Sequence, residues 1–60
     1  MHLYRFRDPD KGEVLVNTTH ISEIYHKNYT KIIMTNGNVY NVMTGELDEV
    51  AGEVRRAAVT

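Results

Sequence analysis

The sequence has 60 residues, no cysteine and a formal net charge of −1, so it predicts one small domain without disulfides or thiolate metal ligands. Its hydrophobic content of 42% is typical of a folded chain and not of a disordered segment. Because a chain of this length buries only about 60% of the surface of its unfolded form, small scaffolds of this kind commonly associate, and we expect a homo-oligomer.

The charge distribution argues against a general nucleic-acid-binding protein. Residues 1–44 carry five basic and four acidic side chains, while residues 45–60 carry two basic and four acidic ones. The chain is therefore not basic overall, although a local basic patch is compatible with these numbers. No apolar run reaches the roughly 18 residues of a membrane span, and the N-terminal stretch becomes polar too early for a signal peptide, so we expect a cytoplasmic protein.

The first 17 residues predict a β-hairpin. Apolar and polar side chains alternate through residues 2–7, so Tyr4 and Phe6 share one face of a strand. The segment DPDKG at 8–12 breaks this pattern with a proline and a glycine, which favour a loop. Alternation resumes in EVLVN at 13–17, and the two runs predict strands joined by a five-residue connection.

A third strand is predicted at residues 20–27, HISEIYHK. The isoleucines fit both a helical and a strand spacing, but the segment is short and its Ile and Tyr residues favour strands. We interpret it as a strand with an irregular or bulged start near residues 19–22. The next turn is expected at residues 27–29.

The best hairpin signal lies between residues 30 and 43. Two runs rich in β-branched and aromatic residues, TKIIMT and NVYNVM, flank Asn36 and Gly37. Both of these residues accept left-handed backbone angles, so they predict a type I′ turn. Ile32 and Met34 would share one face of the first run, with their neighbours on the other face.

The C-terminal segment predicts a helix over residues 45–58, capped by the hydroxyl of Thr44. Acidic residues near its start and Arg55 and Arg56 near its end suit the helix dipole. Gly52 weakens the helix unless close packing requires a glycine there. The apolar positions expected to face the sheet at helical spacing are Leu47, Val50, Ala51, Val54 and Ala58.

Together these elements predict an α+β fold in a single domain, residues 1–60. A small antiparallel sheet of about five short strands lies within residues 2–43, and one C-terminal helix, about 45–58, packs on it. A sheet this small leaves edge strands, and an open edge can pair with a second copy of the chain.

Two groups of side chains are candidates for ligand binding. Arg5 and Arg7 share one strand face and could bind phosphate or an acidic partner, or could simply pair with Glu13 across the hairpin. The second group combines aromatic rings that stack on bases with cations that attract phosphate, although it could also be an ordinary polar turn. Its members are Tyr25, His26, Lys27, Tyr29 and Lys31.

No catalytic or metal constellation is visible in the sequence. The three histidines, at positions 2, 20 and 26, have no recognised ligand spacing and no cysteine beside them. Ser22 cannot build a triad with His20 and His26 on the same strand, and the glycines do not form a phosphate loop. We therefore expect neither an enzyme, nor a cofactor, nor a metal site.

One set of short motifs occurs in order within the segment 14–56: Val16-Asn17, Ile21, Ile24, Thr35-Asn36-Gly37, Tyr40, Val42 and Leu47-Asp48-Glu49-Val50. In these residues the sequence resembles the small FlbD-type flagellar and swarming-motility proteins, and the likeness covers about 50 of the 60 positions in order. The resemblance implies a non-enzymatic, auxiliary interaction protein of a bacterial cell, or of a phage-infected bacterial cell if a phage carries the relative.

Three functions follow as hypotheses. The first is a small oligomeric module that binds a protein partner, with a motility role if the family role holds. The second is a phage-type protein that sequesters a phosphorylated small molecule, such as a signalling nucleotide, between subunits; its candidate ligands are Arg5, Arg7, His26, Lys27, Tyr29 and Lys31. The third is RNA binding by the arginine-containing first strand, because the element order is also the plan of the CsrA-type RNA regulators.

Overall fold

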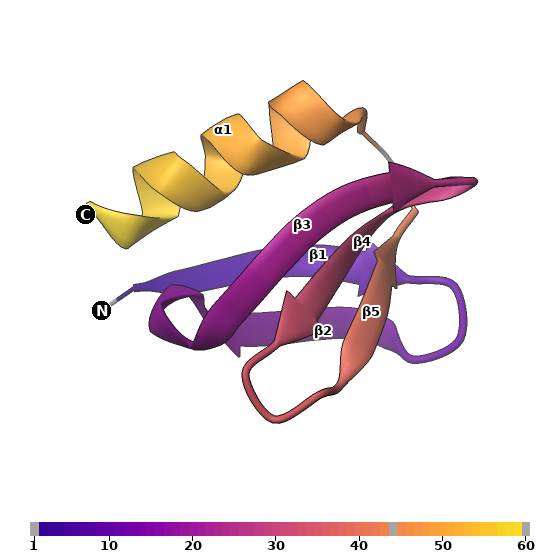
Figure 1. The fold of residues 1–60 in the computed structure, drawn as a ribbon, viewed down its shortest axis with the longest axis horizontal. Coiled ribbons are helices and arrows are strands. Elements are labelled where there is room, and N and C mark those ends of the chain that lie inside the picture. The colour runs from indigo at the N-terminus through magenta and orange to yellow at the C-terminus, as the bar shows by residue number, and fades with distance from the viewer. Residues whose placement is uncertain (1, 44, 60) are drawn as a thin grey trace.

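The computed structural model describes residues 2–43 and 45–59, which form five strands, a short 3₁₀ helix and one α-helix (Figure 1). The predicted α+β fold is confirmed, with the five strands divided between two antiparallel sheets, β1-β2 and β3-β4-β5. The elements are β1 (Leu3–Asp8), β2 (Gly12–Asn17), η1 (Thr18–His20), β3 (Ile21–Lys27), β4 (Tyr29–Met34), β5 (Val39–Val42) and α1 (Leu47–Ala58).

A backbone hydrogen bond joins the two sheets: the Met43 N–H donates to the Arg7 carbonyl at 2.9 Å, which brings the end of β5 beside β1. The Thr35 N–H donates to the carbonyl of His20 at 2.8 Å, which continues the β3–β4 pairing into η1. Figure 1 shows the sheets one behind the other, with α1 lying across one open side.

The core lies between the two sheets and α1. Strand alternation places every second side chain inside, as predicted: Tyr4 and Phe6 are buried on β1, and Ile32 and Met34 on β4. Ile32 has no exposed surface. The buried apolar side chains are Tyr4, Phe6, Val16, Ile32, Met34, Val42 and Val50.

The first hairpin has a shorter connection than predicted. Asp8 pairs with Gly12, so only residues 9–11 lie outside the ladder instead of the five residues 8–12. The Asp8 carboxylate accepts hydrogen bonds from the Asp10 and Lys11 N–H groups at 2.7 and 3.0 Å. Because the side chain satisfies the amides of the turn, the strands can continue to its base.

The irregular start of β3 is confirmed. The register shifts between Ile21 and Glu23, which is the mark of a bulge. The sequence did not reveal η1, which Asn17 caps by accepting a hydrogen bond from the Thr19 N–H at 3.0 Å. At the other end of β3, Asn28 alone makes the turn, with φ +67°.

The type I′ turn predicted at Asn36-Gly37 is wrong. Gly37 has φ +94°, but Asn36 is not among the described residues with positive φ. The Gly37 N–H donates to the Met34 carbonyl, and the Met34 N–H donates to the backbone carbonyl of Asn38. This pair of hydrogen bonds is typical of a type I turn followed by a bulged glycine. The Asn36 side chain favours this form because it accepts a hydrogen bond from the Asn38 N–H at 3.0 Å.

The helix begins two residues later than predicted, with Glu46 at the N-cap instead of Thr44, which lies outside the described residues. The Glu46 N–H donates to the Glu49 side chain at 3.0 Å, so an acidic residue of the first turn satisfies the cap. Val50 and Val54 pack on the core as expected. Ala57 takes the place predicted for Ala58, which is exposed.

Candidate functional site

The outer face of the three-stranded sheet is an exposed surface that carries apolar and aromatic side chains. Alternation along β3, β4 and β5 directs one set of side chains into the core and the other set away from it. We call the second set the outer sheet face. It comprises Glu23, Tyr25 and Lys27 from β3, Tyr29, Lys31 and Ile33 from β4, and Val39 and Asn41 from β5.

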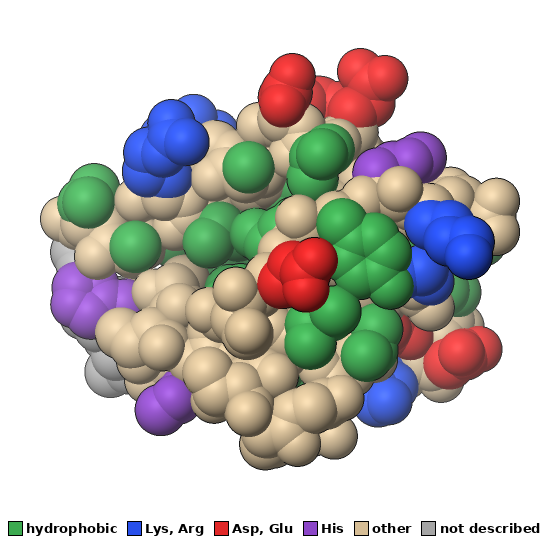
Figure 2. Space-filling view, in the orientation of Figure 1, with side chains coloured by type: hydrophobic (Ala, Val, Ile, Leu, Met, Phe, Trp, Pro, Cys, Tyr) green, Lys and Arg blue, Asp and Glu red, His purple; other side chains and the backbone are tan. Residues whose placement is uncertain are grey.

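Half of the outer sheet face is apolar or aromatic. Tyr29 and Val39 are 42% and 47% exposed, and Tyr25 and Ile33 are partly exposed. Figure 2 looks onto this side and shows hydrophobic side chains gathered over the sheet. An antiparallel sheet with one buried face ordinarily presents polar side chains on the other, so a contiguous apolar group here indicates a contact surface.

The end of this face combines two aromatic rings with two lysines. Tyr25 lies opposite Lys31 in the β3–β4 register, and Lys27 lies opposite Tyr29, so rings and ammonium groups alternate. The Lys31 ammonium donates a hydrogen bond to the Asn41 side chain. Within residues 2–43 and 45–59, Lys27 makes no ion pair. Such a block can stack a ring and bind a phosphate or carboxylate.

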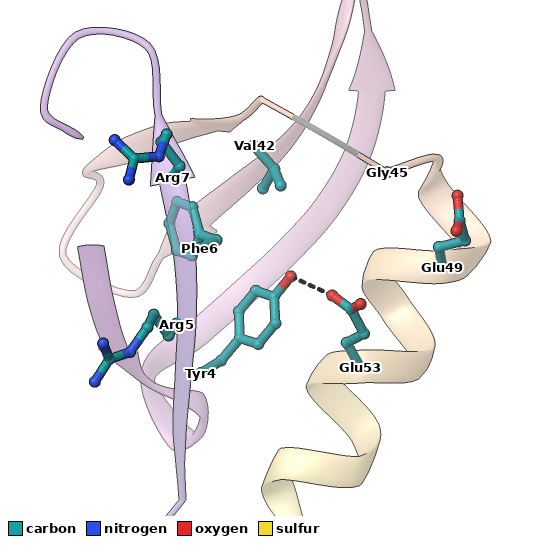
Figure 3. A pocket seen from close by; sticks show the side chains of 8 residues that line it. All are labelled: Tyr4, Arg5, Phe6, Arg7, Val42, Gly45, Glu49 and Glu53. Carbon is teal, nitrogen blue, oxygen red and sulfur yellow. Dashed lines mark hydrogen bonds between the residues drawn. The ribbon is translucent and has the colours of Figure 1, made fainter. Parts of the chain in front are cut away.

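The structure places the six predicted ligand residues in three locations. Lys27, Tyr29 and Lys31 lie together on the outer sheet face. His26 points the other way and lines a cavity of about 310 Å³ at the start of α1, with Glu46, Leu47 and Asp48. Arg5 and Arg7 project from β1 in the other sheet, as Figure 3 shows. Strand alternation explains the separation of His26, which the sequence analysis grouped with its chain neighbours.

A second hollow, of about 390 Å³, lies between β1 and the first half of α1 (Figure 3). The Tyr4 hydroxyl crosses it and donates to the Glu53 carboxylate at 2.7 Å. Burial raises the pKa of Tyr4 well above its usual value, and the hydrogen bond and charge of Glu53 raise it further. We call this hollow the β1 groove; its lining residues are Tyr4, Arg5, Phe6, Arg7, Val42, Gly45, Glu49 and Glu53.

The arginines beside the β1 groove are accessible. The Arg5 guanidinium lies 3.7 Å from the Glu13 carboxylate, and the two side chains are 65% and 57% exposed. A pair this exposed contributes little to stability, so the guanidinium is available to another anion. Arg7 makes no side-chain contact of this kind within the described residues.

Asp8 is a buried carboxylate that the sequence analysis did not single out. It is 3% exposed and accepts three backbone hydrogen bonds, two within its own turn and one from the Asn41 N–H at 2.9 Å. Burial alone would raise its pKa, but these donors and the charge of Lys11 outweigh that effect and lower it. The sequence did hold a signal for its burial, because Asp8 falls on the same face of the alternating strand as Tyr4 and Phe6.

The described residues hold no group of three His, Asp or Glu side chains that could bind a metal ion. Among the helices of residues 2–43 and 45–59, none has the length and apolarity to cross a membrane. Comparisons with protein-family models, with curated proteins and with solved structures find no match.

Proposed function

We propose that the protein is a non-catalytic binding module that contacts a protein partner through the outer sheet face. The observation that carries this proposal is the apolar group of Tyr25, Tyr29, Ile33 and Val39 on a sheet face that α1 does not cover. Aromatic side chains with a polar border are typical of the centre of a protein interface. Glu23, Lys27 and Asn41 supply the polar border here.

The resemblance to FlbD-type proteins supports the same kind of function and suggests the partner. In this proposal the module is an accessory factor of the flagellar apparatus and works by binding, without chemistry of its own. Self-association belongs to the proposal as well, because a 60-residue domain gains stability when it buries apolar surface against another copy.

Site-specific photo-crosslinking in the native host tests the partner proposal. A photoreactive side chain at Val39, on the outer sheet face, should give a specific adduct that disappears when Tyr25→Ser and Tyr29→Ser are added. The matched control carries the same group at Val59, which is 78% exposed at the end of α1. Equal adducts from both positions, or none from Val39, would contradict the proposal.

The alternating rings and lysines favour a second candidate function, the binding of a phosphorylated small molecule. Tyr25, Lys27, Tyr29 and Lys31 would hold it, and Arg5, Arg7 and His26 of a neighbouring copy would complete the site. A nucleotide panel should then raise the melting temperature, because a ligand that binds only the folded state stabilises it. Lys27→Ala with Lys31→Ala should abolish the shift, whereas Arg55→Ala with Arg56→Ala should leave it unchanged.

A further inference from the structure

We infer that the free edge of β2 pairs with the same edge of a second copy, so that two copies share one antiparallel sheet with Leu15 at the two-fold axis. This pairing rests on the self-association that belongs to the proposed function, and it adds the surface, the symmetry and the register. We call the backbone of β2 from Glu13 to Asn17, on the side away from β1, the β2 edge.

The backbone groups of β2 divide between its two sides. The Thr18 N–H donates to the His2 carbonyl, and this pair continues the β1–β2 register. Since the direction of the backbone groups alternates along a strand, Val14 faces β1, while Glu13 and Leu15 face away from it. Among the described residues, no hydrogen bond reaches the N–H or C=O groups of Glu13 and Leu15. These two residues therefore offer free donors and acceptors to another strand.

The space beside the β2 edge is open. α1 packs on β1, β3 and η1, and it lies on the far side of β1 from this edge (Figure 1). A hollow of about 450 Å³ lies between the edge and the turn that joins β4 to β5. Leu15 and Val16 form one wall of this hollow, and Met34 and Tyr40 lie on the other. Within the described part of the chain, no side-chain hydrogen bond or ion pair joins the two walls.

The free edge of β3, by contrast, carries features that oppose strand pairing. A register shift between Ile21 and Glu23 bulges this strand, Lys27 lies at its end, and α1 packs against it. Bulges, lysines and covering helices are the means by which proteins protect sheet edges. All of β2 is described, and it has none of these: its pairing with β1 runs without a register shift, and the exposed side chain at its centre is Leu15.

The side chains select the register. Pairing Glu13 with Glu13 of the second copy would set two carboxylates opposite each other, which is unfavourable, and pairing Glu13 with Leu15 would leave each leucine beside a carboxylate. Pairing Leu15 with Leu15 removes a 51% exposed leucine of each copy from water. The same register sets Glu13 opposite the uncharged Asn17, and on the other face it sets Val14 opposite Val16, a β-branched pair.

Single-cysteine variants test this register directly, because the chain contains no cysteine. In the proposed dimer the Cα atoms of the two Leu15 residues lie about 5.5 Å apart, a distance that a disulfide bridges. Leu15→Cys should therefore give a disulfide-linked dimer under mild oxidation. Glu13→Cys is the matched control: it is also exposed, but it would lie about 13 Å from its copy along the strand and should stay single. The amide spectrum of each variant verifies that it is folded.

Hydrogen exchange of the unsubstituted protein gives an independent readout. The Glu13 and Leu15 amides should exchange roughly tenfold or more slowly at high protein concentration than after dilution, because they gain acceptors only in the dimer. The Val14 amide faces β1 and should be protected at both concentrations.

Three results would overturn the inference. Equal crosslinking of Glu13→Cys and Leu15→Cys would contradict the register. A disulfide from Val39→Cys and none from Leu15→Cys would move the self-contact to the outer sheet face. Fast exchange of the Glu13 and Leu15 amides at every concentration would show that no strand occupies the β2 edge. The partner adduct expected from Val39 does not depend on these results, so failure of the proposed function is observed separately.

Discussion

The Asp8 side chain links the two sheets at their junction. One carboxylate oxygen accepts the Asp10 and Lys11 N–H groups, and the other accepts the Asn41 N–H on β5. A buried N–H without an acceptor costs about 1–3 kcal/mol. This single side chain therefore closes a turn and also holds two elements together.

Asp8→Asn should lower the free energy of unfolding by about 1–3 kcal/mol, because an amide offers one acceptor oxygen where the carboxylate offers two. Urea unfolding curves measure the loss. Asp10→Asn is the matched control: Asp10 is exposed, contributes only its backbone N–H to this network, and should unfold like the unsubstituted protein. Equal losses in both variants would show that general charge, and not the buried network, is responsible.

The same carboxylate predicts a dependence of stability on pH. Its pKa is lowered in the folded state, so the folded form prefers the ionised group. The corresponding stability is present above the unfolded pKa of about 3.9 and is lost as the pH falls through the lower folded value. Unfolding curves measured from neutral to strongly acidic pH should show this loss, and Asp8→Asn should flatten it. An equally steep acid loss in the variant would contradict the assignment.

At the scale of elements, two glycines of the C-terminal segment predict opposite effects. A Cβ at Gly52 would meet only the Arg56 side chain, at 3.6 Å, so no close packing requires this glycine. Gly52→Ala should stabilise the helix by about 1 kcal/mol, or raise the melting temperature by roughly 4–8 °C. Gly45 has φ +99°, and its Cβ would lie 3.2 Å from Val50, so Gly45→Ala should lower the melting temperature.

The attachment of α1 depends on Val50, which is 1% exposed. Val50→Asp would bury a charge, at a cost comparable to the roughly 3–9 kcal/mol of stability expected for 60 residues. The variant should lose its cooperative thermal transition. Val59→Asp places the same charge at a position that is 78% exposed and should melt like the unsubstituted protein. A normal transition for Val50→Asp would count against the packing of α1 on the sheets.

The sequence predicted the elements well where one physical signal dominates. Alternation located the strands, and the helical spacing of apolar residues located α1. The details it missed depend on competing hydrogen bonds: the Asn36 side chain selects a different turn from the one its backbone preference suggests, and Glu46 replaces Thr44 as the N-cap. The docking of the two sheets against each other rests on contacts such as the hydrogen bond from Met43 to Arg7, which no local pattern encodes.

At the scale of the whole molecule, the candidate site was predicted only in part. The sequence placed Lys27, Tyr29 and Lys31 in one cluster, and the β3–β4 register brings these three together. It could not place Arg5 and Arg7 relative to them, because that distance depends on how the two sheets dock. The proposal that Arg5, Arg7 and His26 of a neighbouring copy complete the ligand site requires that several copies of the chain associate.

At this scale we predict that the protein is a homo-oligomer. Native mass spectrometry should show more than one copy of the chain per particle, because the domain is small and leaves apolar side chains exposed on both sheets, Leu15 at 51% and Val39 at 47% among them. Val39→Glu should shift the population toward single copies if the outer sheet face mediates the contact, and Leu15→Glu if the other sheet does. A strictly monomeric species at high concentration would refute the prediction.

The hydrogen bond between Asp8 and Asn41 has a consequence for the order of folding. Residues 3–17 and 21–42 each form a unit of consecutive strands, whereas this bond spans 33 positions of the chain. It can form only once both units exist, so we place it after the rate-limiting barrier. Stopped-flow measurements on Asp8→Asn should then find faster unfolding with an almost unchanged refolding rate.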